Sequence, residues 1–122
     1  MRVGVRDIAY HLPGRVVSNN ELNMENPDWD LTYAGERIGV ESRHIAEEKE
    51  TALDLAFQAC EKLLAANDGL RDMVDGIIFC TQSPDYVMPP NSCILHDMLG
   101  LKDEVFAYDY TLACSGYVYG LA

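Results

Sequence analysis

The chain has 122 residues, of which 48% are hydrophobic and 9% aromatic, a composition typical of a globular protein and not of a disordered one. Acidic residues outnumber basic ones by 20 to 9, which gives a formal charge of −11. This balance argues against nucleic acid and anionic membranes as partners, because both attract basic surfaces.

Processing signals and cysteine spacing narrow the class of protein further. No apolar run approaches the roughly 20 residues that a membrane span needs, and the first residues lack the long apolar region of a signal peptide. The four cysteines form no CxxC pair and no Cys/His cluster. We therefore expect free thiols, no metal site, no resident cofactor and a cytoplasmic protein.

The first third of the chain predicts a strand followed by two short helices. Apolar and polar side chains alternate over Arg2–Leu12, which predicts a strand that a Pro-Gly turn ends. Ser18 and the residue after it can cap a short helix. Asn26-Pro27-Asp28 is a second start signal, and it places Trp29 near the beginning of another helix that runs to about Arg37. The glycine two residues later ends that helix.

The best-defined helix begins at Thr51, where a Thr-x-x-Asp pattern resembles a capping box. It follows a short extended segment over residues 40–46 and ends at Asn67. Its apolar residues recur at helical spacing on one wide face. Cys60 lies within this face, so we expect its thiol to pack in the core.

The remaining elements alternate between strand and helix. A nearly continuous apolar run predicts a strand over Val74–Thr81 that is buried on both faces. A helix over Ser92–Leu99 and a strand over Glu104–Tyr110 follow. This order predicts an α/β fold with a largely parallel central sheet of three strands. Three strands and a short final helix would leave apolar faces uncovered, so we expect the front part of a larger domain.

The last fifteen residues, Tyr108 to Ala122, read YDYTLACSGYVYGLA. The first of them predict the end of a strand, and Ala113-Cys114-Ser115-Gly116 is a turn of small residues before a helix. A cysteine at the start of a helix lies where unpaired N–H groups favour a thiolate. Cys114 is therefore the candidate nucleophile. The alternative is a small buried cysteine beside a tight turn.

The segment TLACSGYVYGLA resembles the active-cysteine segment of β-ketoacyl-acyl carrier protein synthase III, a family of the thiolase superfamily. Four more segments are similar to that family in order and spacing, namely YHLPGRVVSNNEL, RIGVESRHIA, ETALDLAFQA and DGIIFCTQSPDYVMPPNSCILHDMLGL. The resemblance covers essentially the whole chain. It implies a thiolase-like fold, with residues 1–122 forming the first half of the N-terminal α/β layer of a condensing-enzyme domain.

The resemblance also implies a reaction. Cys114 would take an acyl group from an acyl-coenzyme A, and the acyl-enzyme would then condense with malonyl-acyl carrier protein in fatty acid or polyketide synthesis. The Cys114 N–H would help to bind the thioester oxyanion. The family's catalytic histidine and asparagine, which drive decarboxylation, have no match in these residues.

Three further residues match family positions that contact substrate. Arg37 matches the arginine that helps to hold the coenzyme A nucleotide, with an ordinary arginine in a surface helix as the alternative. Trp29 lies eight residues before it, whereas the family commonly has a tryptophan four residues before, so adenine stacking and simple packing both remain open. Met88 matches a phenylalanine that reaches the partner's acyl pocket across a homodimer, with loop packing as the alternative.

The sequence is also compatible with two other functions. One is a relative in the same superfamily that transfers acyl groups or forms esters without decarboxylation. The other is a truncated, non-catalytic module that binds a partner.

Overall fold

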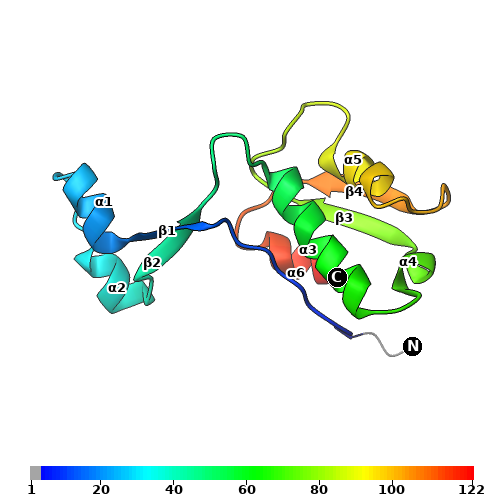
Figure 1. Ribbon diagram of the computed structural model, residues 1–122, viewed down its shortest axis with the longest axis horizontal. Helices are drawn as coiled ribbons and strands as arrows, with labels where there is room; N and C mark the ends of the chain where they lie inside the picture. The colour runs from blue at the N-terminus through cyan, green and yellow to red at the C-terminus, as the bar shows by residue number, and fades with distance from the viewer. Residues whose placement is uncertain (1–3) are drawn as a thin grey trace. The chain divides into compact units, whose positions relative to one another are not determined.

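The structure is a computed structural model that describes residues 4–122. These residues fall into two compact units (Figure 1). The smaller unit is formed by residues 12–50. The larger unit contains the rest of the described chain, so residues 4–11 belong to it together with residues 51–122.

The smaller unit is built on an antiparallel pair of strands. Its elements are β1 (Arg15–Ser18), α1 (Asn19–Glu25), α2 (Thr32–Ile38) and β2 (Ser42–Ile45). Ser18 of β1 lies opposite Ser42 of β2. The sequence predicted the extended segment at residues 40–46, and β2 confirms it.

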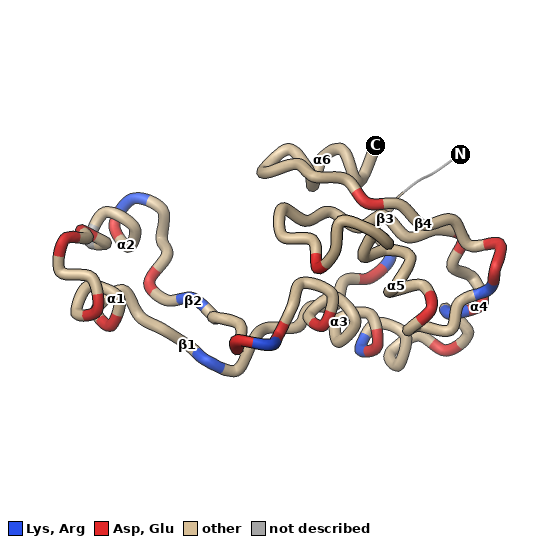
Figure 2. The backbone as a smooth tube through the Cα atoms, turned by 90° about the horizontal axis from the view of Figure 1, so that it is seen from above, with Lys and Arg blue, Asp and Glu red and all other residues tan. Residues whose placement is uncertain are grey.

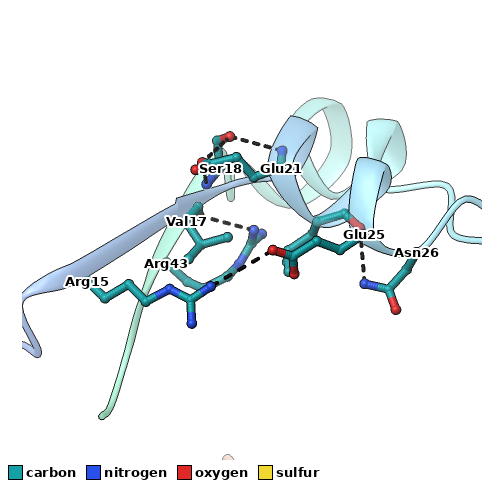
Figure 3. Close-up of polar contacts among 8 residues, drawn as sticks. Arg15, Val17, Ser18, Glu21, Glu25, Asn26 and Arg43 are labelled. Carbon is teal, nitrogen blue, oxygen red and sulfur yellow. Dashed lines mark hydrogen bonds and ion pairs between the residues drawn. The ribbon is translucent and has the colours of Figure 1, made fainter.

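The predicted cap at the start of α1 is confirmed and is a full capping box. The Ser18 hydroxyl accepts the Glu21 N–H at 3.2 Å, and the Glu21 carboxylate accepts the Ser18 N–H at 2.8 Å (Figure 3). These hydrogen bonds lower the pKa of the Glu21 carboxyl. At the end of α2, Gly39 has a φ of 72°, a left-handed conformation that favours glycine, and it ends the helix as expected.

The larger unit contains a parallel pair of strands with helices packed against it. Its elements are α3 (Ala52–Ala66), α4 (Leu70–Met73), β3 (Gly76–Cys80), α5 (Asn91–Met98), β4 (Phe106–Tyr110) and α6 (Gly116–Leu121). The register places Gly76 opposite Phe106 and Cys80 opposite Tyr110. Parallel pairing of these strands confirms the α/β prediction, and the short helix α4 is an element that the sequence analysis missed.

The core of the larger unit lies on one face of this sheet. Four buried side chains from α3, β3 and α5 form its centre, namely Leu53, Phe79, Leu95 and Leu99. Helices α3 and α5 cover this face, and α6 lies on the opposite side of the two strands (Figure 2). Cys60 packs against the core as predicted, and burial raises the pKa of its thiol.

The predicted strand over Arg2–Leu12 is wrong for its described part. Residues 4–12 have no regular secondary structure, and Arg2 lies outside the described residues. The segment has no strand partner among residues 4–122, and Ile8 and Tyr10 leave more than two thirds of their surfaces exposed. The Lys62 ammonium instead donates to the Tyr10 carbonyl oxygen at 3.2 Å. Among residues 4–122, two sheets of two strands each thus take the place of the predicted three-stranded sheet.

The prediction that the strand over residues 74–81 is buried on both faces is also wrong. Phe79 is 8% exposed because it faces α3 and α5, whereas Ile78 on the opposite face is 42% exposed. That opposite face also carries the exposed side chains of Phe106 and Tyr108, whose rings stack at a centroid distance of 6.2 Å. Only the end of this face is covered, by α6.

A polar network fixes the start of α5 on β4. The Asp109 carboxylate accepts the N–H groups of Asn91 and Ser92, both at 2.8 Å. Asn91 is fully buried, and its side chain donates to the Asp85 carboxylate at 2.9 Å. Asp85 also accepts the Leu53 N–H at the first turn of α3. Because α5 has no cap of its own, Asp109 supplies the acceptors that its first N–H groups need.

Replacement of Asp109 by alanine removes both acceptors and leaves two N–H groups unpaired in a buried place. We expect D109A to lower the free energy of unfolding of the whole protein by about 1–3 kcal/mol. Chemical denaturation measures this change, with D103A as the control because Asp103 is exposed in the loop before β4. Equal effects of the two substitutions would contradict the capping role.

Candidate functional site

Cys114 lies in the turn between β4 and α6, two residues before the helix begins. The Gly116 N–H donates to the Ala113 carbonyl oxygen at 2.9 Å and closes this turn. The Cys114 side chain is exposed. Within the described residues Cys114 is thus not buried beside the turn, and the predicted position at a strand-to-helix turn is confirmed.

Gly116 brings α6 into close contact with the ends of both strands. It is buried, and a Cβ atom at this position would lie 2.6 Å from the Cys80 Sγ and 3.6 Å from the Tyr110 Cε2. The Cys80 thiol in turn donates to the Leu112 carbonyl oxygen at 3.7 Å. Only glycine fits this contact without displacing a neighbour.

The sequence analysis did not single out Cys80 and Tyr110. Both are the last residues of parallel strands, and they face each other in the sheet register. Side chains at the carboxyl ends of neighbouring parallel strands meet at one edge of the sheet, and this rule could have identified them. The Tyr110 hydroxyl donates to the Gly116 carbonyl oxygen. Burial raises the pKa of the Tyr110 phenol, and its contact with Cys80 raises that pKa further.

Met88 lies in the loop between β3 and α5 and is 82% exposed. The loop is held near its end by Asp85 and Asn91, where the Asp85 N–H donates to the Asn91 side-chain oxygen at 3.1 Å. The structure therefore presents Met88 on an anchored loop with its side chain free of the core. Its role in substrate binding stays a prediction.

Trp29 and Arg37 belong to the smaller unit. The prediction that Trp29 starts a helix is wrong, because α2 begins at Thr32. The Trp29 N–H donates to the Asn26 carbonyl oxygen at 2.9 Å, so Trp29 closes a turn after α1. Its side chain is 54% exposed. Trp29 and Arg37 therefore do not lie on one helix.

Arg37 is in the last turn of α2, where the sequence predicted the end of a helix, and its side chain is exposed. Its guanidinium carbon lies 5.8 Å from the centroid of the Tyr33 ring, within the range of a cation–π contact. Tyr33 is 63% exposed and lies one helical turn before Arg37. The sequence analysis missed Tyr33, although the spacing of four residues on a helix would have indicated it.

A single side chain holds both ends of α2. The Asn19 amide donates to the Val40 carbonyl oxygen at 2.8 Å and to the Leu31 carbonyl oxygen at 3.4 Å. Leu31 precedes the helix and Val40 follows it. Arg43 of β2 binds the Asn19 side-chain oxygen. Its guanidinium also donates to the Val17 carbonyl oxygen at 3.3 Å (Figure 3). The segment that presents Tyr33 and Arg37 is therefore fixed by hydrogen bonds more than by buried apolar surface.

The larger unit also has an apolar groove away from the Cys114 turn. Its volume is about 580 Å³, and residues 4–7 line it together with Leu63, Asn67, Leu70 and Leu121. The four predicted site residues do not line it. Across residues 4–122 we find no cluster of three His, Cys, Asp or Glu side chains that could hold a metal ion. Within the same residues, every helix is too short or too polar to cross a membrane.

The close contact at Gly116 leads to a prediction about the site. G116A should lower the free energy of unfolding by about 1–3 kcal/mol, because its Cβ would overlap the Cys80 sulfur. The same substitution in a C80A background should cost less. G14A is the control, since nothing lies within 4 Å of a Cβ there. Equal costs with and without the Cys80 sulfur would contradict the proposed contact.

The chain is similar to β-ketoacyl-[acyl-carrier-protein] synthases III along nearly its whole length. The chain is 35% identical to the β-ketoacyl-[acyl-carrier-protein] synthase III of Acidiphilium cryptum over 121 residues, which are 99% of this chain and 37% of that protein. The synthase III of Granulibacter bethesdensis is 36% identical over 118 residues, 97% of this chain and 36% of the relative. No protein-family model matches the chain.

Solved structures agree with these relatives. A crystal structure of 3-oxoacyl-(acyl-carrier-protein) synthase III has 46% identity and a TM-score of 0.84, over 94% of this chain and 34% of that one. The Thermus thermophilus synthase III has 32% identity and a TM-score of 0.85, over 98% of this chain and 36% of that one. OleA of Xanthomonas campestris shares the fold, with a TM-score of 0.77 at 24% identity.

The fold is therefore that of part of a thiolase-like condensing enzyme. Within that class, the chain is a homologue of β-ketoacyl-acyl carrier protein synthase III, which confirms the resemblance found in the sequence. It spans about 37% of the length of the curated relatives that it matches.

Proposed function

We propose that this chain supplies the acyl-accepting cysteine of a synthase III-type condensing enzyme. The observation that carries the proposal is the exposed position of Cys114 in the turn that joins the end of β4 to α6. The relatives at 35–36% identity are named as synthases that act with an acyl carrier protein. We infer the same class of reaction for the whole protein of which these residues are the nucleophile-bearing part.

The first step is an exchange of one thioester for another. The Cys114 thiolate attacks the carbonyl carbon of an acyl-coenzyme A, and a new carbon–sulfur bond forms. The bond between that carbon and the coenzyme A sulfur then breaks, and coenzyme A leaves as a thiolate that takes up a proton. The two thioesters are close in energy, so a soft nucleophile that also leaves well suits this step. A backbone N–H at the turn would stabilise the oxyanion that develops on the thioester oxygen.

We propose that α2 supplies part of the coenzyme A site. Arg37 offers a charged group for the nucleotide phosphates. Tyr33 offers an exposed aromatic face at the spacing of four residues where the family commonly has tryptophan, so we assign base stacking to Tyr33 in place of Trp29. Trp29 is exposed on the preceding turn and can add apolar contact at the edge of this site.

Decarboxylation and condensation, the steps that follow acyl transfer, need catalytic groups that have no match in this chain. We propose that malonyl-acyl carrier protein is the second substrate and that the decarboxylating histidine and asparagine lie elsewhere in the whole protein. The exposure of Met88 on its anchored loop supports a contact with a partner subunit across a homodimer, in which it would limit the length of the acyl chain.

The nucleophile assignment is tested by thiol labelling of the whole protein. We expect iodoacetamide to modify Cys114 before the other three thiols, and a prior incubation with a short acyl-coenzyme A to protect it. C114A should abolish acyl-enzyme formation, while C93A should leave it unchanged because Cys93 is an exposed thiol on α5. Peptide mass spectrometry reads both results. Acylation of Cys80 or Cys93 with Cys114 untouched would refute the assignment.

The nucleotide site is tested by comparing two acyl donors. Y33A and R37A should each raise the KM for acyl-coenzyme A by about tenfold, which corresponds to about 1.4 kcal/mol of lost stacking or phosphate contact. The KM for a short acyl-pantetheine thioester, which lacks the nucleotide, should not change. R15A is the matched control, because Arg15 lies in the same unit and is paired with Glu25 at 3.9 Å. An equal loss with both donors would argue for a structural role.

A further inference from the structure

We propose that Tyr110 is a positioning residue for Cys114: its side chain seats α6 on the end of the sheet and thereby fixes the turn that presents the thiol. This inference rests on the proposed function of Cys114. It adds a residue of this chain that acts on the nucleophile through the backbone, without contact with the substrate.

Gly116 and Gly120 lie one helical turn apart on α6 and leave the space that the Tyr110 ring occupies. A Cβ at Gly116 would lie 3.6 Å from the Tyr110 Cε2, and a Cβ at Gly120 would lie 2.6 Å from the Tyr110 hydroxyl oxygen. Gly116 is buried, and its carbonyl oxygen accepts a hydrogen bond from the Tyr110 hydroxyl. Larger residues at either position would push the helix away from the strand.

The turn that carries Cys114 is tied to the sheet on both sides. On the side before Cys114, the Leu112 carbonyl oxygen accepts the Cys80 thiol at 3.7 Å. On the side after Cys114, the Gly116 carbonyl oxygen accepts the Tyr110 hydroxyl. Cys80 and Tyr110 are paired across β3 and β4. Both ends of the turn are therefore hydrogen-bonded to side chains at the same edge of the sheet. The Cys114 side chain between them stays exposed.

This arrangement assigns separate tasks to the two side chains. The Cys80 thiol is a weak donor and lies far from its acceptor, so its hydrogen bond to the Leu112 carbonyl oxygen is weak. The phenol of Tyr110 is a strong donor, and its ring also fills the space that the glycines leave. Tyr110 therefore constrains the turn more strongly than Cys80 does. Removal of the Tyr110 hydroxyl group tests the proposal.

The geometry is tested by a double-mutant cycle between Tyr110 and Gly120 in the whole protein. In the presence of the hydroxyl, G120A forces a clash and should lower the midpoint temperature of unfolding. In the Y110F background the hydroxyl is gone, and G120A should leave the midpoint unchanged or raise it, because alanine favours a helix over glycine. Y108F is the matched background, since Tyr108 is on the same face of β4 and is half exposed. G120A should cost as much there as in the unchanged protein.

The positioning role is tested by the rate of reaction at Cys114. Y110F should slow acylation of Cys114 by acyl-coenzyme A by about three- to tenfold, the loss expected for one hydrogen bond that holds the site. Iodoacetamide should also modify Cys114 about three- to tenfold more slowly, because a loosened turn holds the thiol in its reactive orientation for less of the time. The labelling of exposed Cys93 and of core Cys60 should not change, which separates positioning from global unfolding. Y108F should match the unchanged protein in all these rates.

Additive effects of Y110F and G120A, or unchanged rates at Cys114 in Y110F, would overturn the inference. Faster labelling of Cys60 in Y110F would also overturn it, since that result means general loss of structure. The experiments judge acylation at Cys114 and positioning by Tyr110 separately. If the unchanged protein forms no acyl-enzyme at Cys114, the proposed function fails, and the iodoacetamide rates and the double-mutant cycle still judge the role of Tyr110.

Discussion

The parallel pairing of β3 with β4 is the constraint on which the larger unit depends. Adjacent residues of a strand face opposite sides of the sheet, and β4 uses its last two residues in this way. Asp109 faces the core side and holds the start of α5 through two N–H groups. Tyr110 faces the other side and holds the first turn of α6. One dipeptide thus positions both the helix that follows the Met88 loop and the turn that bears Cys114.

The smaller unit depends on a different kind of interaction. Pro13 and Val17 are its buried apolar side chains among those whose burial the structure describes, so little of its stability comes from a hydrophobic core. Asn19 instead binds the backbone carbonyl oxygens on either side of α2, and Arg43 links Asn19 to the strand pair. Such a network fixes the orientation of a helix while it leaves the outer face free for a ligand. The exposed Tyr33 and Arg37 lie on that helix.

Features that depend on residues close together in the chain were predicted correctly from the sequence. The caps at Ser18 and Thr51, the glycine that ends α2 and the turn at Cys114 depend on residues within a few positions of each other, and the structure has each of them. The first strand was predicted from alternation alone. Alternation reports which side chains could face a core, but a strand also needs a partner for its backbone groups, and residues 4–12 have none among those described. Tyr33, Cys80 and Tyr110 were missed because each becomes informative only beside a second residue. Tyr33 needs its helical spacing to Arg37, and Cys80 and Tyr110 need the pairing of the two strands that they end.

The central claim is that Cys114 carries the acyl group. The most direct measurement is a crystal structure of the whole protein after exposure to a short acyl-coenzyme A, in which the electron density around all four thiols is compared. We expect continuous density from the Cys114 Sγ to the acyl carbonyl carbon, with Gly116 still hydrogen-bonded to Tyr110. An acyl group on Cys80 or Cys93, or a fully acylated protein with an unmodified Cys114, would contradict the account.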